Sequence, residues 1–241
     1  MSTFPQRGNT MHRNDLRWLA VAAALTVGAA GAQAQEQARI VENGGIHVDG
    51  WMGRIDAAEA GRGQVLENAR LAMEDGALHV TTGPAVAYWN PANTASGSYM
   101  VGATFHEPAY MNRNNHPHPY GVFIGGSDMG TDQQSYLYCA AYGNGNFIVR
   151  GFGPEPFQVN GRRGETSEAV HQAAAAGEPV TQEISITVTP ETVSCSINGT
   201  VVGSYPVTDV VGAGKLTSTD GVFGIRFGHN TEATVTGLHK M

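Results

Sequence analysis

The sequence is poor in positive charge. It has 14 lysine and arginine residues against 21 aspartate and glutamate residues, which gives a formal net charge of −7 at pH 7. The basic residues form no cluster, and the adjacent pair Arg162 and Arg163 is too small to make a basic patch. Proteins that bind nucleic acids or anionic membranes use such a patch to neutralise phosphate. We therefore expect neither nucleic acid nor an anionic membrane surface as a partner.

Long hydrophobic runs are also missing. The apolar run at residues 18–27 is shorter than the roughly 20 residues that a membrane-spanning helix needs. Arg13 and Arg17 precede this run, and Ala32-Gln33-Ala34 follows it. A basic flank, a short apolar segment and an A-x-A site are typical of a secretory signal peptide. We expect residues 1–34 to be a signal peptide, the protein to be periplasmic or secreted, and no membrane span to remain after cleavage.

Cysteine is scarce, with only Cys139 and Cys195 present. Their spacing matches no zinc motif. An exported chain permits a disulfide, which would close a loop of more than fifty residues and contribute about 4 kcal/mol in the chain-entropy model. The alternative is two small buried thiols on core strands.

Helix-forming stretches are few, and the one expected helix is short, at residues 167–176, on the strength of its alanine content. Short runs of alternating apolar and polar residues, separated by glycine-rich turns, predict an all-β domain. We expect an N-terminal extension at residues 35–49 and one β-sandwich domain at residues 50–241. The clearest expected strands are residues 77–82, 98–105, 120–125, 135–142, 146–152, 183–189, 193–198, 200–205, 221–228 and 233–238.

Alternation sorts the strand residues onto two faces. One face of strands 135–142, 146–152 and 221–228 is apolar and includes Cys139. The opposite face carries Tyr136, Tyr138, Arg150 and Arg226, which we call the Tyr/Arg face. Aromatic rings beside arginine suit a sugar, which has apolar faces and hydroxyl rims. We expect a ligand there, with the alternative that the tyrosines only cover the sheet under loops. The expected ligand-binding residues are His118, Tyr120, Tyr136, Tyr138, Arg150, Arg226 and Trp89.

Five segments resemble the concanavalin A-like lectin/glucanase superfamily. They are DGALHVTTGPAVAYWNP (75–91), GSYMVGATF (97–105), YGVFIGG (120–126), ITVTPETVSCSINGTVV (186–202) and DGVFGIRFGHNTEATVTGL (220–238). Within that superfamily the chain looks closest to laminin-G-like modules and to bacterial secreted domains called 3-keto-disaccharide hydrolase domains. The resemblance implies a two-sheet antiparallel jelly-roll sandwich with at most one or two short helices. It also implies a concave sheet that often binds carbohydrate and, in some members, glycoside hydrolysis.

Catalytic signatures are missing. The superfamily's glucanases place two carboxylates on one strand in an E-x-D-x-E pattern, which this sequence does not contain. G-x-S-x-G, H-E-x-x-H and phosphate-loop motifs are also missing. Glu107 and Asp128 are the candidate catalytic carboxylates, and we expect them with His118 near one end of a sheet.

Two segments raise the question of a metal. The loop 127–132 offers Asp128 and Asp132 as calcium ligands, but without the spacing of a known calcium loop, so a solvated loop is the alternative. No other cofactor is expected.

The second segment is His116-Pro117-His118-Pro119. Each histidine precedes a proline, which favours polyproline II geometry, in which residues i and i+2 diverge by about 120°. A third and a fourth ligand would have to come from distant parts of the chain, where His106 and His229 are the only obvious histidine candidates. We therefore predict a stiff lip before strand 120–125 rather than a metal site. This lip would present His118 and Tyr120 beside the Tyr/Arg face.

The sequence favours an exported carbohydrate-binding domain. Two alternatives remain open: a glycoside hydrolase of the same fold, and a non-enzymatic interaction module of the cell envelope. A carbohydrate is the expected ligand, and no protein partner is indicated.

Overall fold

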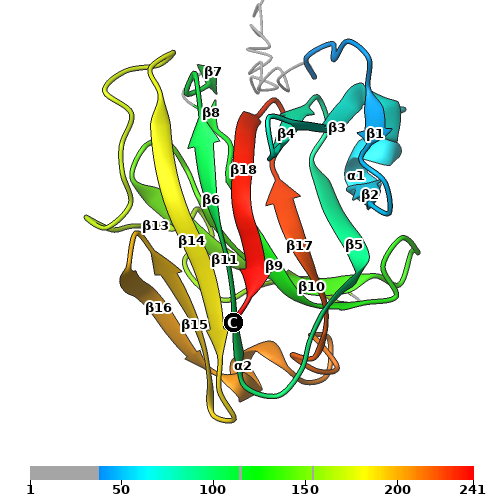
Figure 1. The fold of residues 1–241 in the computed structure, drawn as a ribbon. Coiled ribbons are helices and arrows are strands. Elements are labelled where there is room, and N and C mark those ends of the chain that lie inside the picture. Colours follow the sequence, from blue (N-terminus) through cyan, green and yellow to red (C-terminus); the bar gives the residue numbers. More distant parts are fainter. Residues whose placement is uncertain (1–37, 114–115, 154) are drawn as a thin grey trace, which may run out of the picture. The chain divides into compact units, whose positions relative to one another are not determined.

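The computed structural model describes residues 38–113, 116–153 and 155–241 (Figure 1). The predicted signal peptide lies outside the described residues. Gly45–His47, inside the predicted N-terminal extension, forms strand β1 and pairs in parallel with β3. Within the described ranges, no helix has the length and apolar character needed to cross a membrane.

Two eight-stranded sheets make up the fold. Sheet A has the order β1-β3-β4-β18-β6-β14-β15-β16, and sheet B has the order β12-β11-β10-β9-β17-β5-β2 with β13 paired to β11. Apart from β1 and β3, the neighbouring strands are antiparallel. The strands of sheet A are Gly45–His47 (β1), Ala69–Glu74 (β3), Ala77–Thr82 (β4), Tyr99–Glu107 (β6), Val180–Val188 (β14), Thr192–Ile197 (β15), Thr200–Pro206 (β16) and Glu232–Lys240 (β18). Those of sheet B are Met52–Ile55 (β2), Val86–Ala95 (β5), Tyr120–Ser127 (β9), Ser135–Ala141 (β10), Asn146–Phe152 (β11), Pro156–Gln158 (β12), Glu165–Thr166 (β13) and Gly221–Phe227 (β17).

The remaining elements are short. Asn112–Arg113 (β7) and His116–Pro117 (β8) form a separate hairpin. The described residues contain two four-residue helices, Ala57–Ala60 (α1) and Val207–Val210 (α2), and a 3₁₀ turn at Leu66–Asn68. This architecture confirms the predicted all-β, two-sheet antiparallel sandwich with at most two short helices.

The main core lies between the sheets. Leu137, Cys139 and Ala141 of β10 pack there with Phe223, Ile225 and Phe227 of β17, as the alternation predicts. Cys139 on sheet B and Cys195 on sheet A form a disulfide with a Cα–Cα distance of 5.8 Å, which bonds the two layers covalently. Of the two alternatives that the sequence leaves open, the structure has the bridge and not two free thiols, and a disulfide is typical of proteins from oxidising compartments.

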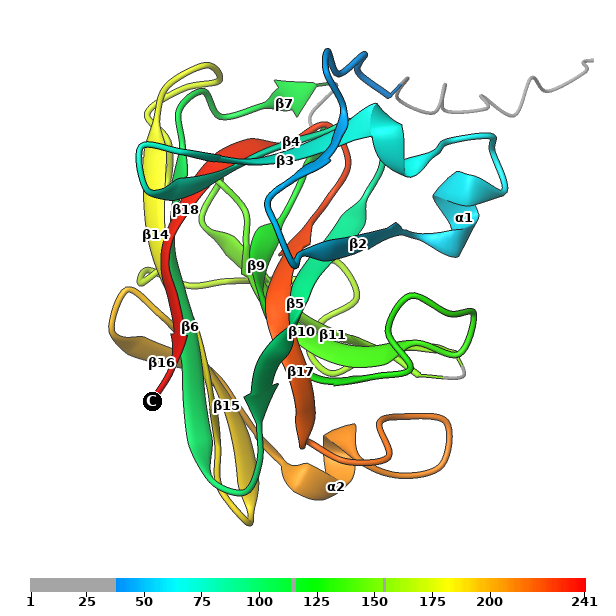
Figure 2. The ribbon, with the colours of Figure 1, turned by 45° about the vertical axis from the view of Figure 1, so that its right-hand side comes forward.

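A second, smaller cluster covers the other side of sheet B. It contains Trp89, Phe123, Tyr136, Tyr138 and Ile148. The segment that contains α1 and the loop between β9 and β10 lie on this side, away from sheet A (Figure 2). We call this side the outer face of sheet B.

The predicted helix at residues 167–176 is wrong. The segment is irregular because its polar groups bond to neighbouring strands instead of forming helical turns. The His171 ring lies 2.8 Å from the Thr181 carbonyl oxygen, and Gln172 forms an isolated bridge with Asn144. Alanine content is a weak preference that such tertiary contacts override.

Candidate functional site

The residues of the Tyr/Arg face lie together on the outer face of sheet B, but most are covered. Tyr136 is 0% exposed, Tyr138 4% and Arg226 5%, whereas Arg150 is partly exposed. The half-buried ring of Phe152 contacts both tyrosines, with centroid distances of 5.1 Å to Tyr136 and 6.3 Å to Tyr138. The face is therefore a packed aromatic and arginine cluster with an accessible rim, rather than an open platform.

Arg226 lies at the centre of this cluster. Its Nη2 donates a hydrogen bond of 2.6 Å to Oδ2 of Asp56, and its Cζ lies 5.7 Å from the Tyr138 ring and 5.6 Å from the Phe152 ring. Among the described residues, neither Arg226 Nη1 nor the Tyr136 hydroxyl has a hydrogen-bond partner, although both are buried. The cluster thus holds two buried polar groups whose hydrogen-bonding capacity is unused.

The β9–β10 loop explains why Trp89 is 2% exposed. Met129 of this loop packs against the outer cluster, and Gly130 passes so close that a Cβ there would lie 3.5 Å from the Trp89 ring. Arg54 of β2 anchors the loop: its Nη1 donates to the Gly130 carbonyl at 2.6 Å, and its Nη2 pairs with the Asp132 carboxylate.

The candidate calcium ligands have other partners. Asp132 pairs with Arg54, and Asp128 Oδ2 accepts a hydrogen bond from the Ser127 hydroxyl at 3.0 Å. The described residues do not gather Asp128 and Asp132 into a group of three or more metal-ligating side chains. Their roles here are loop anchoring and a local turn.

Tyr120 and Glu107 lie between the sheets, not beside the Tyr/Arg face. The Tyr120 ring stacks on Phe105 at 5.6 Å, within the main core. Glu107 is 2% exposed, and its Oε1 accepts a hydrogen bond of 3.1 Å from the Met111 amide. Burial raises the pKa of Glu107 to about 7, against smaller lowering effects of Met111 and Tyr120. Burial and the Glu107 carboxylate in turn raise the pKa of Tyr120.

Glu107 and Asp128 do not form a catalytic pair. Glu107 lies beside Tyr120, which is the first residue of β9. Asp128 lies at the opposite end of that strand, directly after its last residue, Ser127. At about 3.3 Å per residue, the seven steps of β9 separate the two ends by about 23 Å. Glycoside hydrolysis needs carboxylates about 5–10 Å apart. The expectation that Glu107, Asp128 and His118 share one end of a sheet is therefore wrong.

Three histidines lie together where β9 begins and β17 ends. The ligand nitrogens of His116, His118 and His229 are all within 4.8 Å of one another, and no other such group occurs among the residues that the structure describes. The ring centroids of His118 and His229 are 3.8 Å apart, and those of His116 and His118 are 4.9 Å apart. We call these residues the histidine cluster. Burial, followed by the two neighbouring rings, lowers the pKa of His118 to about 3.

The predicted divergence of His116 and His118 is wrong, because their ring centroids are only 4.9 Å apart. His116–Pro117 forms strand β8, paired with β7, and His118 lies between β8 and β9. His229 is one of the two histidines that the sequence offers as a further ligand. The other, His106, lies elsewhere, with its Nδ1 2.8 Å from the Thr181 hydroxyl.

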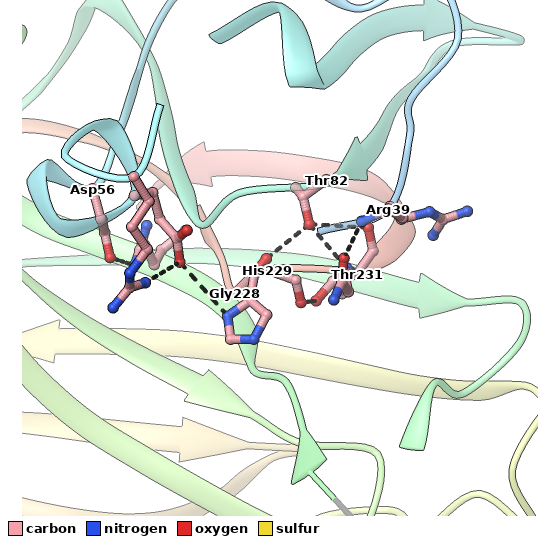
Figure 3. Close-up of polar contacts among 10 residues, drawn as sticks. Arg39, Asp56, Thr82, Gly228, His229 and Thr231 are labelled. Carbon is pink, nitrogen blue, oxygen red and sulfur yellow. Dashed lines mark hydrogen bonds and ion pairs between the residues drawn. The ribbon is translucent and has the colours of Figure 1, made fainter. Parts of the chain in front are cut away.

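Strand register brings His229 to His118. Tyr120 pairs with Phe227, and the same register extended by two residues places His118 opposite His229. The Gly228 amide donates to the Pro119 carbonyl at 2.7 Å, which continues the ladder. Thr82 holds the next turn: its hydroxyl donates to the Gly228 carbonyl at 2.8 Å and accepts from the Thr231 amide at 2.9 Å (Figure 3).

The α1 segment connects the histidine cluster with the Tyr/Arg face. Asp56, directly before α1, binds Arg226, and Glu59 within α1 places its Oε1 4.0 Å from Nδ1 of His229. Arg62 lies 3.6 Å from the same Glu59 oxygen. Both groups of residues therefore border one short stretch of chain.

A cavity of about 340 Å³ lies beside Asn230, the residue after His229. It is lined by Arg39, Pro108, Ala109, Met111, Asn230 and Glu232. This volume is within the range of small-molecule sites. Its lining has no aromatic ring on which a sugar could stack.

Known structures resemble this fold at low sequence identity. No protein-family model matches the chain, and no curated protein matches its sequence. A Bacillus subtilis protein of unknown function with a galectin-like fold is 12% identical, with a TM-score of 0.50 over 79% of this chain and 88% of that chain. The endo-β-1,3-glucanase from Pyrococcus furiosus is 13% identical, with a TM-score of 0.50 over 83% and 88%. The potassium-bound carbohydrate recognition domain of Emp46p is 9% identical, with a TM-score of 0.46 over 79% and 88%. The first two likenesses concern the fold alone, and on that basis the chain shares its two-sheet, galectin-like sandwich fold with these two structures.

Proposed function

We propose that the chain is an exported carbohydrate-binding domain. Its ligand would contact the outer face of sheet B at the rim formed by Tyr142, Arg150 and Phe152. The observation that carries this proposal is the pair of buried, unpartnered polar groups beneath that rim, Arg226 Nη1 and the Tyr136 hydroxyl.

A buried donor without a partner costs about 1–3 kcal/mol, so such groups are normally complemented by water or by a ligand. Here they lie among aromatic rings, and Arg150 stacks over the Phe152 ring at 5.6 Å. A sugar can satisfy both features at once, because its C–H faces pack on rings and its hydroxyls accept from arginine. The predicted signal peptide and the disulfide support the exported location.

Calorimetric titration with a panel of di- and oligosaccharides tests this function. Arg150→Ala removes a charged hydrogen-bond donor worth about 1.5–3 kcal/mol, so we expect about 10- to 100-fold weaker binding. Tyr138→Ala should also weaken binding, because it removes a ring on which Arg226 rests. Arg70→Ala, on β3 of sheet A, is the matched control and should bind normally.

Two outcomes would contradict the proposal. One is no measurable binding to any saccharide in the panel by the folded wild-type chain. The other is binding that Arg150→Ala and Tyr138→Ala leave unchanged. Capture of a protein partner that saccharides do not displace would instead favour the non-enzymatic interaction module.

A glycoside-acting enzyme is the second candidate, supported by the likeness in fold to an endo-β-1,3-glucanase, and Glu107 is the carboxyl to test. A carboxyl that titrates near pH 7 is suited to act as a general acid. Turnover of a glycoside panel by the wild-type chain, lost in Glu107→Gln, would support this role. Turnover that survives in Glu107→Gln would exclude Glu107 as the acid.

A further inference from the structure

We propose that His116, His118 and His229 bind one divalent transition-metal ion, for which Zn²⁺ is the best fit, and leave one coordination position open. This site is additional to the carbohydrate-binding proposal and does not depend on it.

The spacing of the three rings is close to what a metal requires. Zn²⁺ binds imidazole nitrogen at about 2.0–2.1 Å in a tetrahedral arrangement, which places the ligand nitrogens about 3.4 Å apart. The corresponding atoms of the histidine cluster already lie within 4.8 Å of one another. To close the site, the most distant pair of ligand nitrogens would have to approach by at most about 1.4 Å (4.8 − 3.4), a shift that side-chain rotation can supply.

The backbone holds this arrangement in place. The register of β9 and β17 sets His118 opposite His229, and the β7–β8 hairpin brings His116 alongside. Gly228 permits the close approach, because a Cβ there would lie 2.8 Å from Pro119 Cδ and 3.1 Å from His118 Cβ. Ordering of the ligands by the fold lowers the entropy that metal binding must overcome.

The ligand type selects the kind of ion. Imidazole suits Zn²⁺ and other first-row transition metals, whereas Ca²⁺ and Mg²⁺ require oxygen ligands. Three protein ligands with a remaining position for water or a ligand oxygen are typical of an open rather than a structural zinc site. His116 is exposed, so solvent reaches this side of the cluster.

Glu59 supplies the outer partner that metal-binding histidines commonly have. Its Oε1 lies 4.0 Å from His229 Nδ1, an arrangement in which Nε2 of His229 would face the metal. The Glu59 side chain is 15% exposed and is itself held by Arg62 at 3.6 Å.

Zinc titration of the full chain tests the site. The protein carries no histidine tag, is stripped with a chelator and is studied at pH 7.5. We expect one Zn²⁺ per chain by metal analysis, and visible absorption of tetrahedral type when Co²⁺ replaces zinc. Loss of an outer partner lowers metal affinity about 10- to 100-fold, and we expect this decrease for Glu59→Gln. His116→Ala removes a direct ligand, so its zinc affinity should fall by more than about 100-fold.

The controls separate this site from incidental histidine binding. His106→Ala and His79→Ala remove histidines of sheet A outside the cluster and should leave zinc affinity unchanged. Because His116 is exposed, His116→Ala should keep the wild-type circular dichroism and melting temperature without metal. Zinc should raise the melting temperature of the wild type but not of His116→Ala. Substoichiometric zinc in the folded wild type, or equal affinity in wild type, His116→Ala and His229→Ala, would overturn the proposal.

Discussion

Glu107, Asp132 and Arg226 each carry an ionisable side chain, and their surroundings give them different properties. Asp132 is 90% exposed at its side chain and pairs with Arg54 at the surface. Arg226 is buried but keeps its charge, because its Nη2 pairs with Asp56. Its Nη1 has no hydrogen-bond partner among the described residues. Glu107 is buried, and no cationic side chain in the described part of the chain pairs with it, so its charged form is destabilised.

Glu107 should make the stability of the fold depend on pH. Its pKa is about 7 in the folded chain against 4.5 for the free group, so the folded state holds the proton more tightly. This contribution is fully present below pH 4.5 and is lost as pH rises toward 7, by about 3 kcal/mol. Urea unfolding at pH 5 and pH 8 should show this loss in the wild type and a smaller loss in Glu107→Gln. The exposed Glu67→Gln is the control, and an equal pH dependence in wild type and Glu107→Gln would count against this account.

Loops and strand ends cover the Tyr/Arg face and complete the histidine cluster. The β9–β10 loop covers Trp89, and the turn after β17 delivers His229. The α1 segment supplies both Asp56 and Glu59. Such segments are fixed by a few polar contacts, so single substitutions can move them without unfolding the sheets.

Arg54→Ala should loosen the β9–β10 loop. The substitution removes the hydrogen bond to the Gly130 carbonyl and the pairing with Asp132, so the loop should leave the Trp89 ring more exposed. In a Trp18→Phe/Trp51→Phe background, which leaves Trp89 as the single tryptophan, we expect the emission to shift to the red and acrylamide quenching to increase. Arg39→Ala breaks a comparable ion pair, with Glu232 at 3.0 Å, and should leave the emission unchanged. Unaltered quenching in Arg54→Ala would mean that apolar packing alone holds the loop.

The two sheets are joined both by the core between them and by one covalent bond. Cys139 and Cys195 are 56 residues apart in sequence and connect β10 with β15. Both cysteines lie in the core between the sheets, where Cys139 is 0% and Cys195 2% exposed. The bridge therefore restricts the unfolded chain more than it adds contacts to the folded one.

Replacement of both cysteines by alanine should lower the free energy of unfolding by about 4 kcal/mol, the loop-closure value for a bridge of this length. Urea unfolding of Cys139→Ala/Cys195→Ala against the oxidised wild type measures the change. Wild-type protein that is reduced and alkylated in urea should fail to regain the same midpoint on refolding. An unchanged midpoint in the double variant would show that the core alone sets the stability.

The long strands could be predicted because their signal is local. Alternation along β10 and β11 places Leu137 and Val149 on the core side and Tyr138 and Arg150 on the other. The structure confirms this assignment: Leu137 and Val149 belong to the main core, and Tyr138 belongs to the cluster on the outer face. Strands β1, β2, β7, β8, β12 and β13 have two to four residues each, too few for alternation to be detected.

The sequence by itself determined the sandwich class, the strand faces and the two cysteines available for a bridge, because periodicity and composition act over a few residues. Tertiary structure alone decided what covers the Tyr/Arg face, since Met129, Gly130 and Phe152 reach it from loops and strand ends. It also decided that His229 meets His116 and His118. That meeting depends on the register of two strands more than one hundred residues apart, which no local pattern encodes.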